Sequence, residues 1–267
     1  MYAVELDGVS QVYVNRKGAY VALQGVQLAI APGEFVSLIG PSGCGKTTVL
    51  SLISGLLTPT SGTVRVLGEP IQKPTPKVGY MLQQDYLFPW RTIFENASIG
   101  LELLGRLNAA SRQYVLDLLD EMGLGGYADR YPHQLSGGMR QRVALVRTLA
   151  AEPDILLLDE PFSALDYQTK LQLEDLISAT LKARGKTAVL VTHDITEAIA
   201  MSDRIVVLQP NPGRVLTEVI VPEAIREAQP LHAREVGGFH ELFRELWGRF
   251  EQMDGKGGGG HGPAETT

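Results

Sequence analysis

The sequence predicts an α/β fold in which helices cover a mostly parallel sheet, with an antiparallel sheet beside this core and an all-helical segment inserted into it. Three observations support this prediction. Short apolar runs alternate with amphipathic helical stretches, the first part of the chain alternates apolar and polar residues, and strand signals stop in a long central stretch. The length of 267 residues, with 44% hydrophobic and 20% charged residues, suits one large globular domain.

Four short apolar runs predict the buried strands of the parallel sheet. They are 35–39 (FVSLI), 155–158 (ILLL), 188–192 (AVLVT) and 205–208 (IVVL). Three of them are rich in Val and Ile, and ILLL is assigned from its length and from its position directly before Asp159. Alternating segments between Val4 and Val66, such as VQLAIAPGE and GTVRVLG, predict the antiparallel sheet.

The central stretch from about residue 92 to residue 133 reads as helical. Thr92 and Glu95 have the spacing of a capping box, which begins one helix. A second helix, which Gly123 can end, carries its apolar residues on one face: Val115, Leu118, Leu119 and Met122. We therefore expect an all-helical subdomain over about 92–145.

The end of the chain is predicted to be a helical extension, 223–254, followed by a flexible tail, 255–267. The extension carries a helical stripe of large apolar residues: Phe239, Leu242, Phe243, Leu246, Trp247 and Phe250. We expect this stripe to pack on its own domain, and a partner-binding or dimer role is the alternative. The tail is rich in glycine, and its His261 is expected to have no role.

Charge and cysteine content narrow the class of protein. The net charge of −6 gives no reason to expect a nucleic acid as partner. A single cysteine, Cys44, excludes an intrachain disulfide and fits a reducing cytosol. The first residues show no secretory signal, and no apolar run approaches the roughly 18–20 residues that cross a bilayer. If the protein serves a membrane, we expect another chain to cross it.

A phosphate-binding loop is predicted at 40–47, GPSGCGKT, which fits G-x-x-x-x-G-K-[ST]. Its context is specific, because it follows an expected strand and precedes a helical stretch. Glycines let the backbone N–H groups surround phosphate oxygens, and the start of the helix adds its positive dipole end. The residues expected to contact ATP here are Gly40, Pro41, Ser42, Gly43, Cys44, Gly45, Lys46, Thr47 and Thr48. This motif predicts a P-loop NTPase core of the RecA-like type.

Within this loop, Lys46 can reach the β- and γ-phosphates, the Thr47 hydroxyl can bind Mg²⁺, and Thr48 continues the start of the helix. A redox switch at Cys44 is the less favoured interpretation, because thiol reactivity needs specific activation. We expect Cys44 to be a small residue tolerated where side chains point away from the ligand.

Two carboxylates follow the apolar run 155–158. The end of a parallel strand places such residues in the crevice where ligands bind. Asp159 is suited to hold Mg²⁺, directly or through water, and Glu160 is suited to activate the attacking water as general base.

The segment 135–142, LSGGMRQR, resembles the signature of ABC ATPases, and the resemblance extends over about residues 4–215. We expect Ser136, Gly137 and Gly138 to begin a helix, a position suited to binding an anion. The resemblance implies that this anion is the γ-phosphate of an ATP held by a second copy. Two ATP molecules would then lie between two head-to-tail protomers. It also implies an ABC ATPase domain over 4–222.

Further residues match other elements of that family in the expected order. Gln83 resembles the Q-loop glutamine, which contacts metal and water, and Gln84 is the neighbouring candidate. Asp166, in 163–166 (SALD), resembles the D-loop that lines the dimer seam. The resemblance implies that His193 contacts the γ-phosphate. Tyr13 resembles the aromatic residue that stacks on adenine, although Tyr20 competes for this role and core packing is the alternative for Tyr13.

Two rival functions are disfavoured. A DNA-repair or chromosome ATPase of this family needs a long coiled-coil insertion, whereas only about ninety residues separate Lys46 from Ser136. The signature segment argues against a P-loop kinase.

The resemblance therefore implies an ATPase that uses ATP and Mg²⁺ as a homodimer and powers separate transmembrane permease subunits. LFPWRTI and the NPGR of 211–214 resemble the importers of nitrate, sulfonate and taurine. This group implies an extracytoplasmic solute-binding protein and a location at the cytoplasmic face of a bacterial inner membrane, without a nucleic-acid partner. An exporter subunit, or an importer with another cargo, is the alternative.

Overall fold

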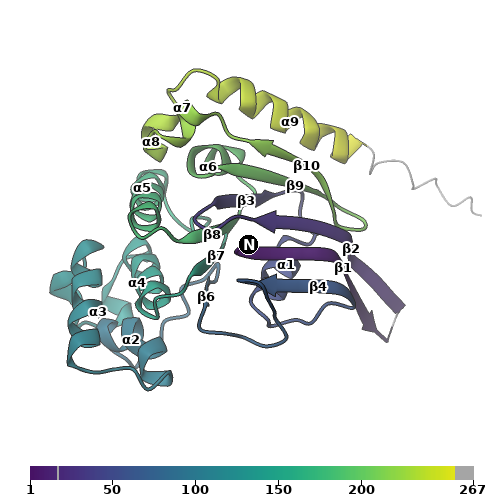
Figure 1. Cartoon of the computed structure of the whole chain (residues 1–267). Helices are drawn as coiled ribbons and strands as arrows, with labels where there is room; N and C mark the ends of the chain where they lie inside the picture. The colour runs from purple at the N-terminus through teal and green to yellow at the C-terminus, as the bar shows by residue number, and fades with distance from the viewer. Residues whose placement is uncertain (17, 256–267) are drawn as a thin grey trace, which may run out of the picture.

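The structure, a computed structural model, describes residues 1–16 and 18–255, with only the backbone for residues 254 and 255. In this part of the chain the strands form two sheets, and helices cover the larger one (Figure 1). The flexible tail predicted for 255–267 lies, from residue 256 on, outside the described residues. No helix in the described ranges combines the length and the hydrophobicity needed to cross a bilayer.

The larger sheet is the mostly parallel core that the apolar runs predict. Its strands lie in the order β10-β9-β3-β8-β7-β6, and β10 alone runs antiparallel to its neighbour in this described sheet. They are β3 (Phe35–Ile39), β6 (Val78–Met81), β7 (Ile155–Asp159), β8 (Thr187–Val191), β9 (Arg204–Gln209) and β10 (Arg214–Ile220). Side chains of β3, β7 and β8 are buried throughout, as expected for strands covered on both faces.

Two strands of this sheet lack an apolar run that predicts them. β10 lies at the sheet edge, and its residues alternate between exposed and half-buried. β6 has four residues, of which three are half-buried. Both have partly exposed side chains, so their sequences lack the continuous hydrophobicity of the central strands.

The second sheet is antiparallel and occupies the first part of the chain, as the alternating pattern predicts. Its order is β2-β1-β4-β5, with β1 (Val4–Asn15), β2 (Gly18–Ile30), β4 (Ser61–Val66) and β5 (Glu69–Pro70). A shared hydrophobic core joins this sheet, helix α1 (Lys46–Ile53) and one face of the parallel sheet.

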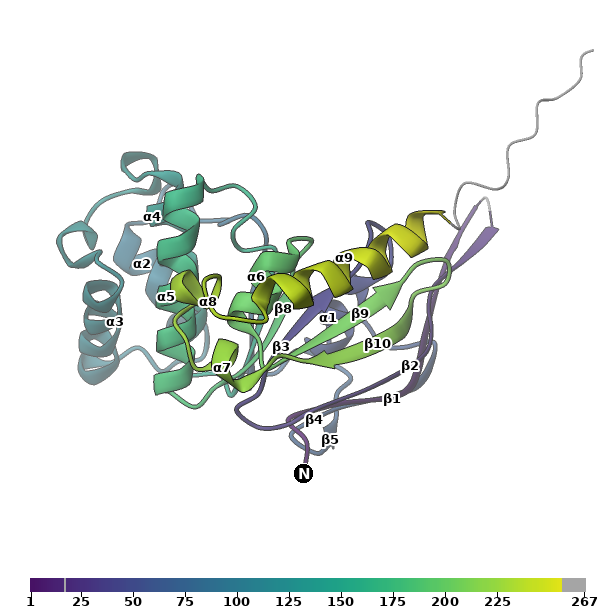
Figure 2. The same ribbon diagram turned by 90° about the horizontal axis from the view of Figure 1, so that it is seen from above.

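The central stretch forms helices α2 (Ile93–Leu103), α3 (Ala109–Glu121) and α4 (Gly137–Ala150), with 3₁₀ turns at Gly125–Tyr127 and Pro132–Gln134. The predicted capping box of α2 is present. The Glu95 N–H donates to Thr92 Oγ1 at 3.2 Å, and the Thr92 N–H donates to Glu95 Oε2 at 2.7 Å. Figure 2 shows these helices grouped beside the sheets rather than over them.

The remaining helices are α5 (Tyr167–Ala183), α6 (Ile195–Met201), α7 (Glu223–Arg226), α8 (Pro230–Ala233) and α9 (Phe239–Gly255). The apolar stripe of α9 packs on its own chain, because Phe239, Leu242 and Leu246 are buried together with residues of α6 and β9. This confirms the expectation for the stripe. Trp247 lies at its edge, about half exposed and stacked on Phe243.

Candidate functional site

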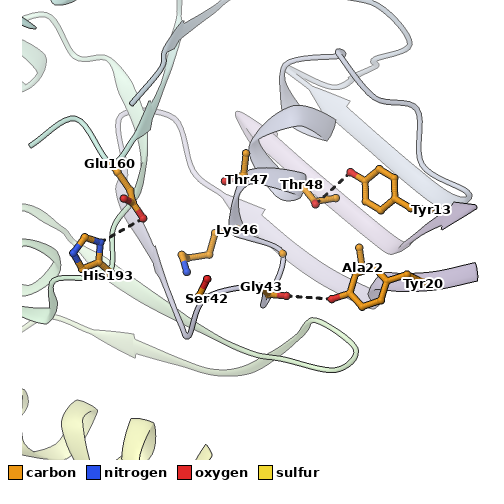
Figure 3. A pocket seen from close by; sticks show the side chains of 11 residues that line it. Tyr13, Tyr20, Ala22, Ser42, Gly43, Lys46, Thr47, Thr48, Glu160 and His193 are labelled. Atoms are coloured by element: carbon orange, nitrogen blue, oxygen red, sulfur yellow. Dashed lines mark hydrogen bonds and ion pairs between the residues drawn. The ribbon is translucent and has the colours of Figure 1, made fainter. Parts of the chain in front are cut away.

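The carboxyl ends of three neighbouring parallel strands place the predicted polar residues together. Gly40 follows β3, Asp159 ends β7, and His193 follows β8 by two residues, in a sheet where β8 lies between β3 and β7. A cavity of about 480 Å³ opens here (Figure 3). Its lining residues among those described are Tyr13, Tyr20, Ala22, Ser42, Gly43, Gly45, Lys46, Thr47, Thr48, Glu160 and His193.

The loop after β3 depends on glycines because its backbone packs tightly. A Cβ on Gly40 would lie 2.4 Å from the Leu208 carbonyl oxygen, and Gly45 has a φ of 99°. The Lys46 ammonium lies inside the loop, where it donates to the Gly40 carbonyl at 2.7 Å and to the Pro41 carbonyl at 3.1 Å. The ammonium can donate hydrogen bonds to a phosphate oxygen in this loop in place of the two carbonyl oxygens.

Cys44 is fully buried, and its sulfur lies 3.8 Å from Lys46 Nζ. Burial raises the pKa of the thiol, an effect that the Lys46 charge partly offsets. A raised pKa disfavours the reactive thiolate, in line with the preference against a redox switch.

Asp159 is the buried carboxylate of the site, 8% exposed. The Tyr80 hydroxyl, on β6, donates to Asp159 Oδ2 at 3.2 Å. Burial raises the pKa of Asp159, and the Glu160 charge adds to this rise, whereas the Tyr80 and Thr47 hydroxyls and the Lys46 charge lower it. Burial and the Asp159 charge raise the pKa of Tyr80, so this phenol stays protonated and remains a donor. Tyr80 belongs to no motif that would mark it as a site residue in the sequence.

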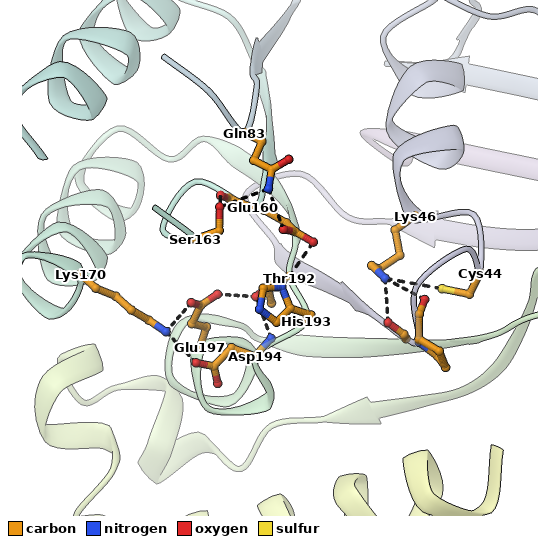
Figure 4. Close-up of polar contacts among 12 residues, drawn as sticks. Cys44, Lys46, Gln83, Glu160, Ser163, Lys170, Thr192, His193, Asp194 and Glu197 are labelled. Carbon is orange, nitrogen blue, oxygen red and sulfur yellow. Dashed lines mark hydrogen bonds and ion pairs between the residues drawn. The ribbon is translucent and has the colours of Figure 1, made fainter. Parts of the chain in front are cut away.

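Glu160 is held by neighbours on both sides (Figure 4). The Gln83 side-chain amide donates to Glu160 Oε2 at 3.1 Å, and His193 Nδ1 lies 3.4 Å from Glu160 Oε1. Gln83 also donates to the Ser163 hydroxyl at 3.3 Å. Gln83 and Gln84 both line a separate crevice, and Gln83 is the one that contacts Glu160. The backbone of Glu160 has a φ of 45°, in the left-handed region that non-glycine residues seldom occupy. Such strain is concentrated at functional sites.

Tyr13 and Tyr20 both line the cavity, so the structure does not favour one over the other as the residue that contacts adenine. They are direct partners across the antiparallel pair of β1 and β2, which places both rings on one face. Figure 3 shows the Tyr13 hydroxyl at Thr48, 3.4 Å away, and the Tyr20 hydroxyl donating to the Gly43 carbonyl at 3.4 Å. Both are partly exposed, which argues against core packing for Tyr13.

The signature residues lie elsewhere. Ser136 caps α4 by accepting from the Met139 N–H at 3.3 Å, and Ser136 and Gly137 are exposed. Neither is among the described residues that line the cavity. Gly138 is buried, and a Cβ there would lie 2.3 Å from Thr169 Cγ2 on α5. Asp166, before α5, is exposed and caps that helix by accepting from the Thr169 N–H at 3.1 Å.

The NPGR segment packs against β2 and the phosphate loop, a structural role that its sequence did not predict. Gly213 donates its N–H to the Ala22 carbonyl at 3.0 Å, and its carbonyl accepts from the Gln24 N–H at 2.9 Å. A Cβ on Gly213 would lie 2.3 Å from the Cys44 carbonyl oxygen. Only glycine at position 213 lets this segment lie so close to both β2 and the phosphate loop.

Comparisons with known proteins give one family. The family model described as ABC transporter matches residues 23–163. A Bacillus subtilis (strain 168) protein, the uncharacterized ABC transporter ATP-binding protein YtlC, is 46% identical over 95% of this chain and 98% of its own length. The taurine import ATP-binding protein TauB of Ruegeria pomeroyi is 39% identical over 96% of this chain and 98% of its own.

The nitrate import ATP-binding protein NrtC of Synechococcus elongatus is 41% identical over 93% of this chain, which corresponds to 38% of the longer protein. Among solved structures, a dimeric ATP-binding cassette in a post-hydrolysis state, bound to ADP and Pi, is similar with a TM-score of 0.72. It is 35% identical and covers 82% of this chain and 99% of its own. The chain therefore belongs to the ABC transporter family, as an ATP-binding subunit that hydrolyses ATP.

Proposed function

We propose that two copies of this chain close on two ATP molecules and power solute import through a separate membrane permease. The observation that carries this proposal is the contact of Gln83, Glu160 and His193 beside the phosphate loop. A carboxylate flanked by an amide and an imidazole at this place has the chemistry needed to orient and deprotonate a water molecule.

The residues at the end of β7 fit a Mg²⁺ ion bound with ATP. Mg²⁺ prefers oxygen ligands, takes one or two carboxylates, and completes its shell with water and phosphate oxygens. Asp159 and the Thr47 hydroxyl supply such oxygens. They lie close together, because the Thr47 hydroxyl interacts with the Asp159 carboxyl group and lowers its pKa. No cluster of three or more His, Cys, Asp or Glu able to hold a metal occurs in the described residues, which suits an ion held mainly by phosphate. Mg²⁺ when bound would neutralise charge on the β- and γ-phosphates.

The residues of this chain then have separate roles in binding and hydrolysing ATP. Lys46 exchanges the Gly40 and Pro41 carbonyls for phosphate oxygens, and Glu160 accepts the proton of the attacking water. Gln83 and His193 hold Glu160 from two sides and face the γ-phosphate. Tyr13, with Tyr20 beside it, supplies the aromatic surface for adenine.

The exposed start of α4 is the part of the site that we assign to the second copy. An N-terminal helix end with a serine cap attracts an anion, and Ser136 and Gly137 are open to one. A head-to-tail pair would bring this end against the γ-phosphate held by the partner, with 163–166 along the seam. The solved neighbour is dimeric, which supports the arrangement.

A negative charge introduced at Ser136 tests the head-to-tail pairing of the two copies. In a Glu160→Gln background that retains ATP, size-exclusion chromatography should show a dimer that forms when ATP is added. Ser136→Asp keeps the helix cap but places a carboxylate against the γ-phosphate, so the dimer should be lost; Ser136→Asn, a neutral cap of the same size, should retain it. Equal dimerisation of the Asp and Asn variants, with unchanged melting temperatures, would contradict the pairing.

The helical subdomain offers the surface for the permease. A groove of about 840 Å³ lies along α2 and α3, and Trp90 beside it is 71% exposed. Gln83 and Trp90 belong to the same connection between β6 and α2, so a movement at the ATP site can reach this surface. Trp90→Glu should abolish co-purification with the permease of this transporter, whereas Trp247→Glu, at the other tryptophan, should not. Equal recovery of the permease with both variants would refute this surface.

For the cargo we propose a small anion or zwitterion of the nitrate, sulfonate or taurine type, imported with a solute-binding protein at the cytoplasmic face of a bacterial inner membrane. Relatives named for nitrate and taurine import support this assignment. Calorimetric titration of the solute-binding protein of this transporter, with nitrate, taurine and an alkanesulfonate, tests it. Binding of a sugar or an amino acid in their place would overturn the cargo assignment and leave the ATPase assignment intact.

A further inference from the structure

A partly buried cluster of charged side chains lies behind the loop that carries His193. Its members come from α5, from the turn between β8 and α6, from α6 and from the segment after α8. They are Lys170, Glu174, Thr192, Asp194, Glu197 and Arg234. None of them lines the ATP cavity described above.

The first layer of the cluster fixes the residues on both sides of His193 (Figure 4). The Lys170 ammonium lies 2.6 Å from Asp194 Oδ2 and 2.5 Å from Glu197 Oε1. The Thr192 hydroxyl donates to Glu197 and accepts from the Asp194 N–H at 3.0 Å. His193 stands between two anchored neighbours, with its own side chain exposed toward Glu160. Lys170 is therefore the cation on which the position of this loop depends.

The second layer joins the C-terminal extension to the same helix. Glu174 is fully buried on α5, and Arg234 Nη2 donates to its Oε2 at 2.7 Å. Glu174 Oε1 has no hydrogen-bond partner among the described residues. Burial raises the pKa of Glu174 to about 7, with Glu197 adding to the rise and with Arg234 and Lys170 opposing it. Arg234 also donates to the Pro230 carbonyl at 2.7 Å, which fixes its place after α8.

The carboxylates of the two layers compete for the Lys170 ammonium. Lys170 and Glu174 are four residues apart on α5, so they share a face and lie one turn apart. A buried carboxylate without a partner attracts the nearest ammonium strongly while it is ionised, because the surroundings screen its charge poorly. Arg234 lowers the pKa of Glu174, so without Arg234 that pKa rises further and the free carboxylate forms only in alkaline solution. With Arg234 in place, Glu174 has its own cation and Lys170 remains with Asp194 and Glu197.

We propose that Arg234 is a positioning residue for ATP hydrolysis: by pairing with Glu174 it keeps Lys170 on the two carboxylates that hold the His193 loop. The C-terminal extension thereby supports the catalytic geometry of the ATPase domain predicted over 4–222. This inference rests on the proposed role of His193 at the γ-phosphate. A purely structural alternative is that the pair only fastens α8 to α5.

The test is a set of charge variants of the full chain, assayed for ATP hydrolysis from neutral to alkaline pH and well below their melting temperatures. Compared with wild type at the same pH, Arg234→Met should lower kcat about tenfold at the alkaline end, the scale of loss for a slightly displaced catalytic group, with KM for ATP within about twofold of wild type. The loss should shrink toward neutral pH, where Glu174 without Arg234 is protonated. Arg234→Lys and the double variant Glu174→Gln/Arg234→Met should regain most of the kcat, because neither leaves a free carboxylate to draw Lys170 away. Arg244→Met, which removes an exposed arginine of the same extension, should match wild type.

A double-mutant cycle with His193→Ala separates positioning from simple fastening. If Arg234 acts through His193, Arg234→Met should change the residual kcat of His193→Ala by less than about twofold. An equal loss in both backgrounds, a kcat that follows melting temperature alone, or a loss that Glu174→Gln does not relieve would overturn the inference. A wild-type kcat for His193→Ala would instead refute the proposed role of His193. If Arg234→Met does not fold, the double variant must still show near-wild-type kcat, and a tenfold loss there refutes the inference.

Discussion

The two halves of the proposed ATP site are built in different ways. The cradle, which we define as residues 40–48 with Gln83, Asp159, Glu160 and His193, sits where parallel strands end and is held by contacts within one chain. The cap, residues 136–138, begins α4 and has Ser136 and Gly137 exposed. In the proposed pair, the cradle is thus complete in one copy, whereas the cap would meet a phosphate only on another copy.

This difference separates the effects of substitutions. A change in the cradle damages the site of the chain that carries it, either in ATP affinity or in hydrolysis. A change in the cap damages the partner's site and leaves the affinity of the single chain for ATP unchanged. The following predictions use this separation, beginning with the largest expected effect.

Glu160→Gln should slow hydrolysis by about 10²–10⁴, the range for loss of a general base, while ATP binding stays intact. Glutamine keeps the shape and can still meet Gln83 and His193, but it takes no proton. The measurement is phosphate release, with ATP affinity followed by a fluorescent analogue. Unchanged turnover would show that Glu160 is not the base. Exposed Glu69→Gln serves as the control.

Lys46→Ala should weaken ATP binding by about 10- to 100-fold, since it removes a charge-assisted bond to phosphate. Calorimetric titration measures this loss. Arg65→Ala, which removes a half-buried cation from β4 outside the cavity, is the control and should bind ATP normally. Normal affinity of Lys46→Ala would contradict the phosphate-loop assignment.

Mixing two defective chains sharpens the comparison further. A Lys46→Ala chain retains its cap, and a Ser136→Asp chain retains its cradle. In a head-to-tail pair of the two, one site combines the intact cradle with the intact cap, and the other site has neither. The mixture should hydrolyse ATP although each variant alone does not. A mixture as inactive as its components would show that cradle and cap do not meet across two chains.

Gly138→Ala should weaken ATP-driven dimerisation by about tenfold, because overpacking of a tight contact typically costs 1–3 kcal/mol. The added Cβ would lie 2.3 Å from Thr169 Cγ2, so the start of α4 must shift. Thr169→Ser removes that methyl group and should restore dimerisation in the double variant. ATP affinity of the single chain should stay normal throughout. A double variant as weak as Gly138→Ala would exclude this contact as the cause.

The sequence predicted the cradle well because each of its motifs is local. A glycine-rich loop after a strand, or two carboxylates at a strand end, has one place in a parallel sheet, and Lys46, Asp159 and Glu160 lie there. The contacts that escaped prediction join distant parts of the chain. Tyr80 meets Asp159 because β6 pairs with β7, and Arg234 meets Glu174 across sixty residues. No local pattern encodes such pairs.

The two tyrosines show a different limit. The sequence posed a choice between Tyr13 and Tyr20 for the adenine, which assumes that one of them points away. Strand register places both on one face, because they are directly paired across β1 and β2. The sequence pattern alone did not indicate which residues of the two strands would be paired.

Tyr80→Phe should have the smallest effect, because it removes one hydrogen bond and no charge. The Tyr80 hydroxyl orients Asp159 from β6, so its loss should raise the Mg²⁺ concentration for half-maximal hydrolysis by about threefold, within the range for one hydrogen bond to a half-buried group. At saturating Mg²⁺ the ion itself would hold Asp159, so kcat should equal that of wild type. Tyr114→Phe, at another half-buried phenol outside the cradle, should change neither value. A large drop in kcat at saturating Mg²⁺ would show that Tyr80 shapes the cradle beyond this one bond, and that the cradle depends on β6 as much as on the strands that carry its motifs.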